Sequence, residues 1–128
     1  MSQNNINNYS PLALAFMGDA VYEVLVRRAL VARANCPAGR LHEMSVELVR
    51  ASAQAAAANR ILPHLSEEEL AVFKRGRNAH PAHLPRGAKI GDYHAATGLE
   101  ALFGWLYLNG QMERIDCLFA IILEASGA

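Results

Sequence analysis

Two acidic side chains, Asp19 and Glu100, lie within apolar segments that have helical spacing, residues 14–21 and 97–104. Burying an unpaired charge costs on the order of several kcal/mol, so buried acids usually have a charged or hydrogen-bonding partner or a bound cation. A glycine closely precedes each acid, and because glycine costs about 1 kcal/mol relative to alanine inside a helix, we expect close helix packing there. We therefore expect both acids to face one site and to hold a divalent metal ion. The open alternative is that Asp19 is a structural acid, with a carboxylate that accepts a hydrogen bond from a backbone group or from a hydroxyl group such as that of Tyr22.

The helical neighbours of the two acids favour magnesium over zinc. Positions three and four residues away carry neither cysteine nor histidine, and several of them, such as Ala15, Ala96 and Gly104, are small enough to leave room for an ion. Magnesium prefers oxygen ligands and binds proteins through one or two carboxylates plus substrate phosphate. The chemistry expected of such an ion is water attack on a phosphate ester.

A cluster of cationic residues follows in the stretch from 74 to 94, although the 12 basic and 12 acidic residues of the chain leave a net charge of zero. A-form RNA offers phosphates and 2′-hydroxyls across a shallow minor groove, which suits a charged, pliable loop. The alternative is a solvated helix end with ordinary surface cations. We expect RNA contacts from Lys74, Arg75, Arg77, Asn78, Arg86 and Lys89.

Histidines in the same stretch offer a different interpretation. His80, His83 and His94 could be taken as zinc ligands, but a structural zinc site needs four ligands at tight spacing. The two cysteines lie in other segments and are expected to be reduced and structural. His42 is expected to be structural rather than a general base.

Five helices and no strand are expected to position these groups. Ser10 is a suitable N-cap, Ser66 with Glu69 has the capping-box pattern, and Asn109-Gly110 is a natural helix end. The expected helices cover roughly residues 11–32, 40–60, 66–77, 92–108 and 111–125, with a loop over 79–91.

The first of these helices is apolar on two sides. One stripe contains Leu14, Met17, Val21 and Leu25, and the other contains Phe16, Ala20 and Val24. A helix with two apolar faces needs more than one packing partner, so we expect a homodimer formed through this helix.

Length and composition describe a single domain over residues 1–128. Hydrophobic residues make up 52% of the chain, and no apolar run reaches the 18 residues of a membrane span. Residues 1–9 are rich in asparagine, are expected to be flexible, and lack the basic and apolar regions of a signal peptide. A cytoplasmic location without membrane contact is therefore expected.

The segments that carry the two acids resemble a known family. Residues 12–23 are similar to the signature helix of the ribonuclease III catalytic domain, and residues 100–108 are similar to its second acidic motif. Three further segments, 41–42, 49–55 and 74–79, resemble Mini-ribonuclease III, the short form without a double-stranded-RNA-binding domain. The resemblance extends from about residue 12 to residue 123, with five motifs in the same order.

The resemblance implies an all-α, ribonuclease III endonuclease-domain-like bundle that acts as a homodimer. It implies cleavage of double-stranded RNA with Mg²⁺, or Mn²⁺ as a substitute, leaving a 5′-phosphate and a 3′-hydroxyl, with each protomer cutting one strand. Asp19 would be the catalytic aspartate and Glu100 a metal ligand. The implied task is maturation of the precursor of large-subunit (23S) ribosomal RNA, and whether a ribosomal protein presents that RNA stays open.

The chain departs from full-length ribonuclease III at two positions. Ala15 and Thr97 stand where that family has acids, which leaves two carboxylates per active centre. The alternative function is a catalytically inactive module that binds structured RNA or pre-ribosomal particles. The presence of both Asp19 and Glu100 favours the enzyme.

Overall fold

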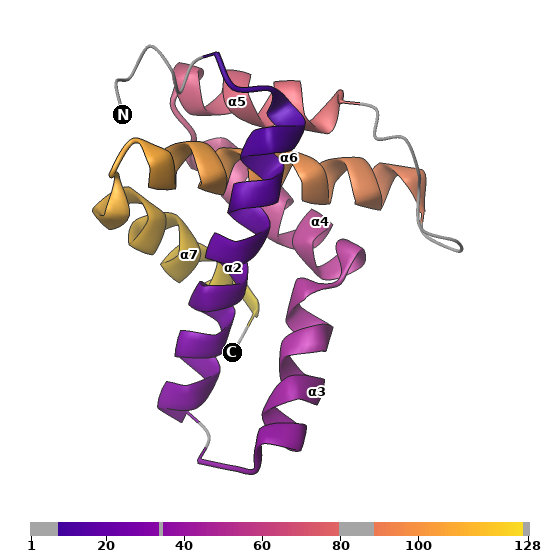
Figure 1. Ribbon diagram of the computed structural model, residues 1–128, viewed down its shortest axis with the longest axis vertical. Coiled ribbons are helices and arrows are strands. Elements are labelled where there is room, and N and C mark those ends of the chain that lie inside the picture. The colour runs from indigo at the N-terminus through magenta and orange to yellow at the C-terminus, as the bar shows by residue number, and fades with distance from the viewer. Residues whose placement is uncertain (1–7, 34, 80–88, 127–128) are drawn as a thin grey trace.

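The computed structural model describes residues 8–33, 35–79 and 89–126, and all regular structure within them is helical (Figure 1). The elements in chain order are α2 (Pro11–Arg33), α3 (Ala38–Val49), α4 (Ala51–Ile61), the short 3₁₀ helix η1 (Leu62–His64), α5 (Glu67–Arg77), α6 (Ile90–Leu108) and α7 (Met112–Ser126). The all-α class is confirmed, with one helix more than expected. Across these described ranges, each helix is too short or too polar to cross a membrane.

The predicted helix ends agree with the structure where a capping residue marked them. The Ala13 N–H donates to Ser10 Oγ at 3.1 Å, and Ser66 and Glu69 form the reciprocal capping box that begins α5. Helix α6 ends at Leu108, before Gly110, whose φ of 73° is in the left-handed region that favours glycine. The residues from 80 to 88 of the expected loop lie outside the described residues.

The single helix expected over 40–60 is two helices, because the chain is extended at Arg50 with φ −65° and ψ 157°. The Arg50 N–H donates to the Val46 carbonyl at the end of α3, and the Arg50 carbonyl accepts from the Gln54 N–H at the start of α4. The Gln54 side chain also donates through Nε2 to the carbonyl of Val49 at 2.8 Å. This bond satisfies a carbonyl that the end of α3 leaves without a helical partner.

Helix α6 forms the centre of the molecule. It crosses behind α2, with α5 above it and α7 below it in the view of Figure 1, and it also packs against α4. Every residue of α6 from Ala96 to Leu106 is buried except Glu100, which is half-buried. A helix that is apolar on all sides is expected at a protein centre, so the carboxyl group of Glu100 is the exception in this stretch.

Glycines allow α2 and α6 to cross in direct backbone contact. A Cβ atom added at Gly18 would collide with the carbonyl oxygen of Glu100 and would lie 2.9 Å from the amide nitrogen of Gly104. A Cβ atom added at Gly104 would likewise collide with the Leu14 carbonyl oxygen. The expectation that the glycine before Asp19 serves close packing is confirmed.

A second pair of glycines brings α5 against another side of α6. A Cβ at Gly76 would lie 2.6 Å from the Cβ of Ala101, and a Cβ at Gly98 would lie 2.8 Å from the Phe73 carbonyl oxygen. The C-terminal turn of α5 is therefore held against the turn of α6 that contains Glu100.

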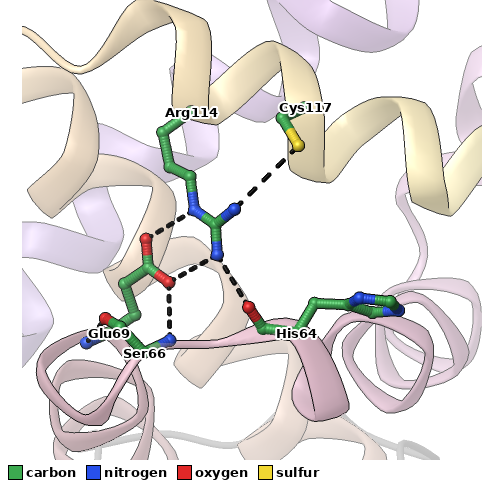
Figure 2. A network of polar contacts seen from close by, with 5 residues as sticks. All are labelled: His64, Ser66, Glu69, Arg114 and Cys117. Atoms are coloured by element: carbon green, nitrogen blue, oxygen red, sulfur yellow. Dashed lines mark hydrogen bonds and ion pairs between the residues drawn. The ribbon is translucent and has the colours of Figure 1, made fainter.

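A buried polar network fastens α7 to the start of α5 (Figure 2). The guanidinium of Arg114 donates to both carboxylate oxygens of Glu69, each at 2.8 Å, and to the His64 carbonyl oxygen at 2.7 Å. The Arg114 guanidinium also holds the pKa of Glu69 below its usual range. The Glu69 side chain is only 7% exposed and that of Arg114 is 31% exposed, so the carboxylate half of this ion pair is buried.

Candidate functional site

The crossing of α2 and α6 brings Asp19 and Glu100 together. The two carboxyl groups are near enough for charge repulsion and a shared hydrogen bond to act between them. Asp19 is exposed, whereas Glu100 is half-buried. The expectation that both acids are buried is therefore wrong for Asp19, because its position on α2 lies at the edge of the stripe that packs into the core.

The electrostatics of the pair disfavour two negative charges. Burial raises the pKa of Glu100 to about 8, and the adjacent Asp19 carboxylate adds to the rise by repulsion and by the shared hydrogen bond. The amide of Gln54 opposes the rise, because it donates to the ionised carboxylate. A cation at the pair would relieve the repulsion between the two carboxylates.

Gln54 of α4 is the third side chain at this crossing, and sequence reasoning missed it. Its Nε2 donates to Val49 as described and lies 3.5 Å from Oε2 of Glu100. The residue is 3% exposed, and its Oε1 atom is buried without a hydrogen-bond partner. Two signals were present in the sequence: a polar residue within the alanine-rich run from 53 to 58, and its place in the segment 49–55 that resembles Mini-ribonuclease III.

These donors fit a hard, hydrated cation. The two carboxylates supply oxygen ligands only, which suits Mg²⁺ or Mn²⁺ better than zinc. Within the ranges that the structure describes, no cluster of three or more His, Cys, Asp or Glu side chains is placed to hold a metal. The site is thus limited to two protein carboxylates, as the alanine and threonine at positions 15 and 97 predicted.

Tyr22, which offered the structural alternative, is close enough to Glu100 for the carboxylate charge to act on its hydroxyl, but its ring is buried in the core. Its ring packs against Phe103 and Phe119, with centroids 5.5 and 5.7 Å away, and burial raises the pKa of its hydroxyl. The side chains that hydrogen-bond to the Glu100 carboxyl group are those of Asp19 and Gln54. Of the three histidines considered as zinc ligands, two lie outside the described residues, and the third is half-buried on α6.

The expected RNA-binding cations gather at the end of α5. Lys74 and Arg75 are exposed, and the guanidinium of Arg77 lies 5.8 Å from the centre of the Phe73 ring. Asn78 is the C-cap residue of α5. Lys89 is exposed at the N-cap of α6, and the remaining cation, at position 86, lies outside the described residues.

One face of α2 remains apolar and exposed. Phe16 is 84% exposed and Val24 is 64% exposed, whereas Leu14 and Leu25 of the other stripe are buried. Beside this face is a groove of about 400 Å³ between α2, the C-terminal end of α6 and the start of α7. Its walls include Met17, Ala20, Val24, Tyr107 and Met112.

Residues 12–111 match the ribonuclease III domain family. The chain belongs to this family. Among its ribonuclease III relatives, Mini-ribonuclease 3 of Thermoanaerobacter sp. (strain X514) is 44% identical over 97% of this chain and 87% of the relative. Mini-ribonuclease 3 of Brevibacillus brevis is 47% identical over 85% of this chain and 81% of the relative. A crystal structure of a protein from Fusobacterium nucleatum superimposes with a TM-score of 0.85 at 30% identity, covering 95% of this chain and 98% of that one.

Membership of the ribonuclease III family confirms the resemblance found in the sequence and supports RNA endonuclease activity. Ribonuclease III enzymes depend in general on divalent metal ions, which agrees with the oxygen-only donor set at the α2–α6 crossing. The family match includes both Asp19 and Glu100.

Proposed function

We propose that this protein is a magnesium-dependent endoribonuclease that cleaves double-stranded RNA, with Asp19 and Glu100 as its catalytic, metal-holding acids. The observation that carries the proposal is their meeting at the α2–α6 crossing, where burial raises the pKa of Glu100 to about 8 and repulsion by the Asp19 carboxylate adds to the rise. Charge repulsion of this kind is typical of carboxylates that share a cation or a proton in function.

Asp19 and Glu100 divide the work according to their surroundings. Asp19 is exposed and can approach a phosphodiester of a bound RNA strand, while Glu100 is half-buried and fixed from behind by α4. A divalent cation held by both acids, Mg²⁺ or Mn²⁺, supplies Lewis acidity for water attack on the phosphodiester. The products would be a 5′-phosphate and a 3′-hydroxyl.

The cations at the end of α5 would bind the RNA backbone. The Gly76 contact holds Lys74, Arg75 and Arg77 near the turn of Glu100, so one duplex could contact both groups. Phosphate contacts of this kind position a duplex without reading its sequence. The substrate implied by the resemblance to Mini-ribonuclease III is the precursor of 23S ribosomal RNA. The enzyme would cleave this RNA in the cytoplasm.

A homodimer would let each protomer cut one strand. The exposed Phe16 and the adjacent groove on the same helix support association with a second copy, because a side chain of that size is costly to leave in water. The Phe16 ring of a second copy would suit this groove, because it would contact mainly aliphatic and methionine side chains.

A cleavage assay on duplex RNA in Mg²⁺ tests the proposal. Asp19→Asn and Glu100→Gln should each lower the cleavage rate by at least about 100-fold, which is the lower range for a positioned catalytic group. Glu124→Gln, which removes an exposed acid on α7, should cleave at the wild-type rate. Binding of duplex RNA without cleavage in Mg²⁺ or Mn²⁺ would instead indicate the inactive binding module.

A further inference from the structure

We propose that Gln54 is a positioning residue of this site, which steadies the Glu100 carboxylate through its amide nitrogen and offers its amide oxygen to the water shell of the bound cation. The inference rests on the proposed function, because it requires Asp19 and Glu100 to hold a cation. It adds a role for a third helix, α4, which supplies no carboxylate to the crossing.

The contact with Val49 fixes which way the Gln54 amide faces. A backbone carbonyl accepts hydrogen bonds and cannot donate them, so the group 2.8 Å from the Val49 oxygen must be the NH₂ of Gln54. The reversed amide would place two oxygens against each other. The Oε1 atom is therefore directed away from Val49, and it is two bonds from the nitrogen that lies 3.5 Å from Glu100.

The orphaned oxygen indicates a missing ligand. Among the residues that the structure describes, Gln54 Oε1 is the buried side-chain polar atom that has no hydrogen-bond partner. A buried acceptor without a donor costs about 1–3 kcal/mol, whereas an apolar side chain of the same shape avoids that cost. The bond to the Val49 carbonyl uses only the amide donor of Gln54, so capping α3 does not account for the buried oxygen.

A hydrated cation supplies what Oε1 lacks. Mg²⁺ and Mn²⁺ held by only two protein carboxylates keep several water molecules, and each water is a hydrogen-bond donor. Groups that orient the ligands and waters of a metal change its affinity by about 10- to 100-fold when they are removed. Gln54 is suited to orient both the Glu100 ligand and a metal-bound water, because its Nε2 lies 3.5 Å from Oε2 of Glu100 and its Oε1 has no hydrogen-bond partner.

The test is Mn²⁺ binding to the protein alone, measured by electron paramagnetic resonance, together with thermal unfolding in metal-free buffer. Gln54→Met keeps the length of the side chain but removes both its donor and its acceptor. We expect Mn²⁺ affinity to fall by about 10-fold or more. The melting temperature in metal-free buffer should change little, because losing the bond to Val49 and removing the orphaned oxygen have opposite effects on stability. Gln54→Leu repeats the test with a second apolar side chain, so that the result does not depend on one variant folding.

Ser45→Ala is the matched control. Ser45 is also buried and also donates to a helix carbonyl, that of His42 at 2.8 Å, but it lies on α3 away from the two acids. This variant should lose stability and keep the wild-type Mn²⁺ affinity. If Gln54→Met behaves in the same way, Gln54 only caps α3, and the inference is overturned.

Asp19→Asn separates failure of the inference from failure of the proposed function. Wild-type binding that Asp19→Asn abolishes and Gln54→Met retains would overturn the role of Gln54 alone. Absence of Mn²⁺ binding by the wild type, or equal binding by Asp19→Asn, would remove the metal site and with it both proposals.

Discussion

The carbonyl oxygen of Glu100 lies against Gly18 so closely that no Cβ atom fits between them. Gly18, which directly precedes Asp19, therefore contacts the backbone of Glu100. Backbone contact, rather than two flexible side chains, sets the separation of the helices at the site. Preorganisation of this kind lowers the cost of assembling a metal site or a reacting group.

Gly18→Ala tests this relationship. The added methyl group would meet backbone atoms of α6, which cannot rotate away, so we expect a loss of about 3 kcal/mol or more, at the upper end for overpacking. Cleavage should fall as well, because the acids would be forced apart. Denaturant unfolding measures the first effect, with Gly39→Ala as control, since nothing lies within 4 Å of a Cβ there. Equal stability of the two variants would contradict the packing argument.

The raised pKa of Glu100 predicts a pH dependence of stability without metal. The pKa is about 8 in the folded protein against a usual value of 4.5, so between these values the folded state holds a proton that the unfolded state has lost. Folding stability therefore falls as the pH rises through this window. Glu100→Gln should show a flatter profile when unfolding is followed in chelator from about pH 5 to about pH 9. Parallel profiles for the two proteins would rule out a raised pKa.

The cations of α5 should set the salt dependence of RNA binding. Each lost phosphate contact lowers the slope of log affinity against log salt by about 1. We expect Lys74→Ala with Arg75→Ala to weaken binding of several duplex sequences about equally and to lower the slope. Arg40→Ala, which removes an exposed cation paired with Glu43 on α3, is the control. An unchanged slope would assign the α5 cations to the solvated surface.

The exposed face of α2 should govern the oligomeric state. Phe16→Asp places a charge where we expect a second copy to bury an aromatic ring, so sedimentation should show a monomer at concentrations that keep the wild type dimeric. Ile90→Asp changes another exposed apolar residue, 59% exposed on α6, and should leave the wild-type state unchanged. A wild-type monomer at micromolar concentration would contradict the dimer directly.

Local signals in the sequence predicted most of the helices. Ser10, the Ser66–Glu69 box and Gly110 each act within one turn of a helix end, and their ends were found within one or two residues. The break at Arg50 was missed because the apolar spacing continues through it. At the end of α3, the Gln54 side chain donates a hydrogen bond to the Val49 carbonyl, and apolar periodicity does not reveal such a contact.

The site was predicted only in part, because the sequence shows local signals but not the contacts between distant residues. The sequence indicated that Asp19 and Glu100 belong together and that glycine brings their helices close. It did not reveal that Asp19 is exposed, because burial at the edge of a helix stripe depends on which neighbours cover it. Gln54 escaped notice because its partners, an acid 46 positions away and a helix break, exist only in the folded chain.

The ribonuclease III match ends at residue 111, immediately before α7, yet α7 is not an appendage. Cutting the chain at that boundary would remove Arg114 and with it the ion pair of Glu69, whose side chain is 7% exposed in the full chain. It would also strip Leu118 and Phe119, 0% and 3% exposed, from the core. A fragment that ends at the family boundary would therefore lose part of the core, and we expect a trimmed nuclease to fold only if it retains the last helix.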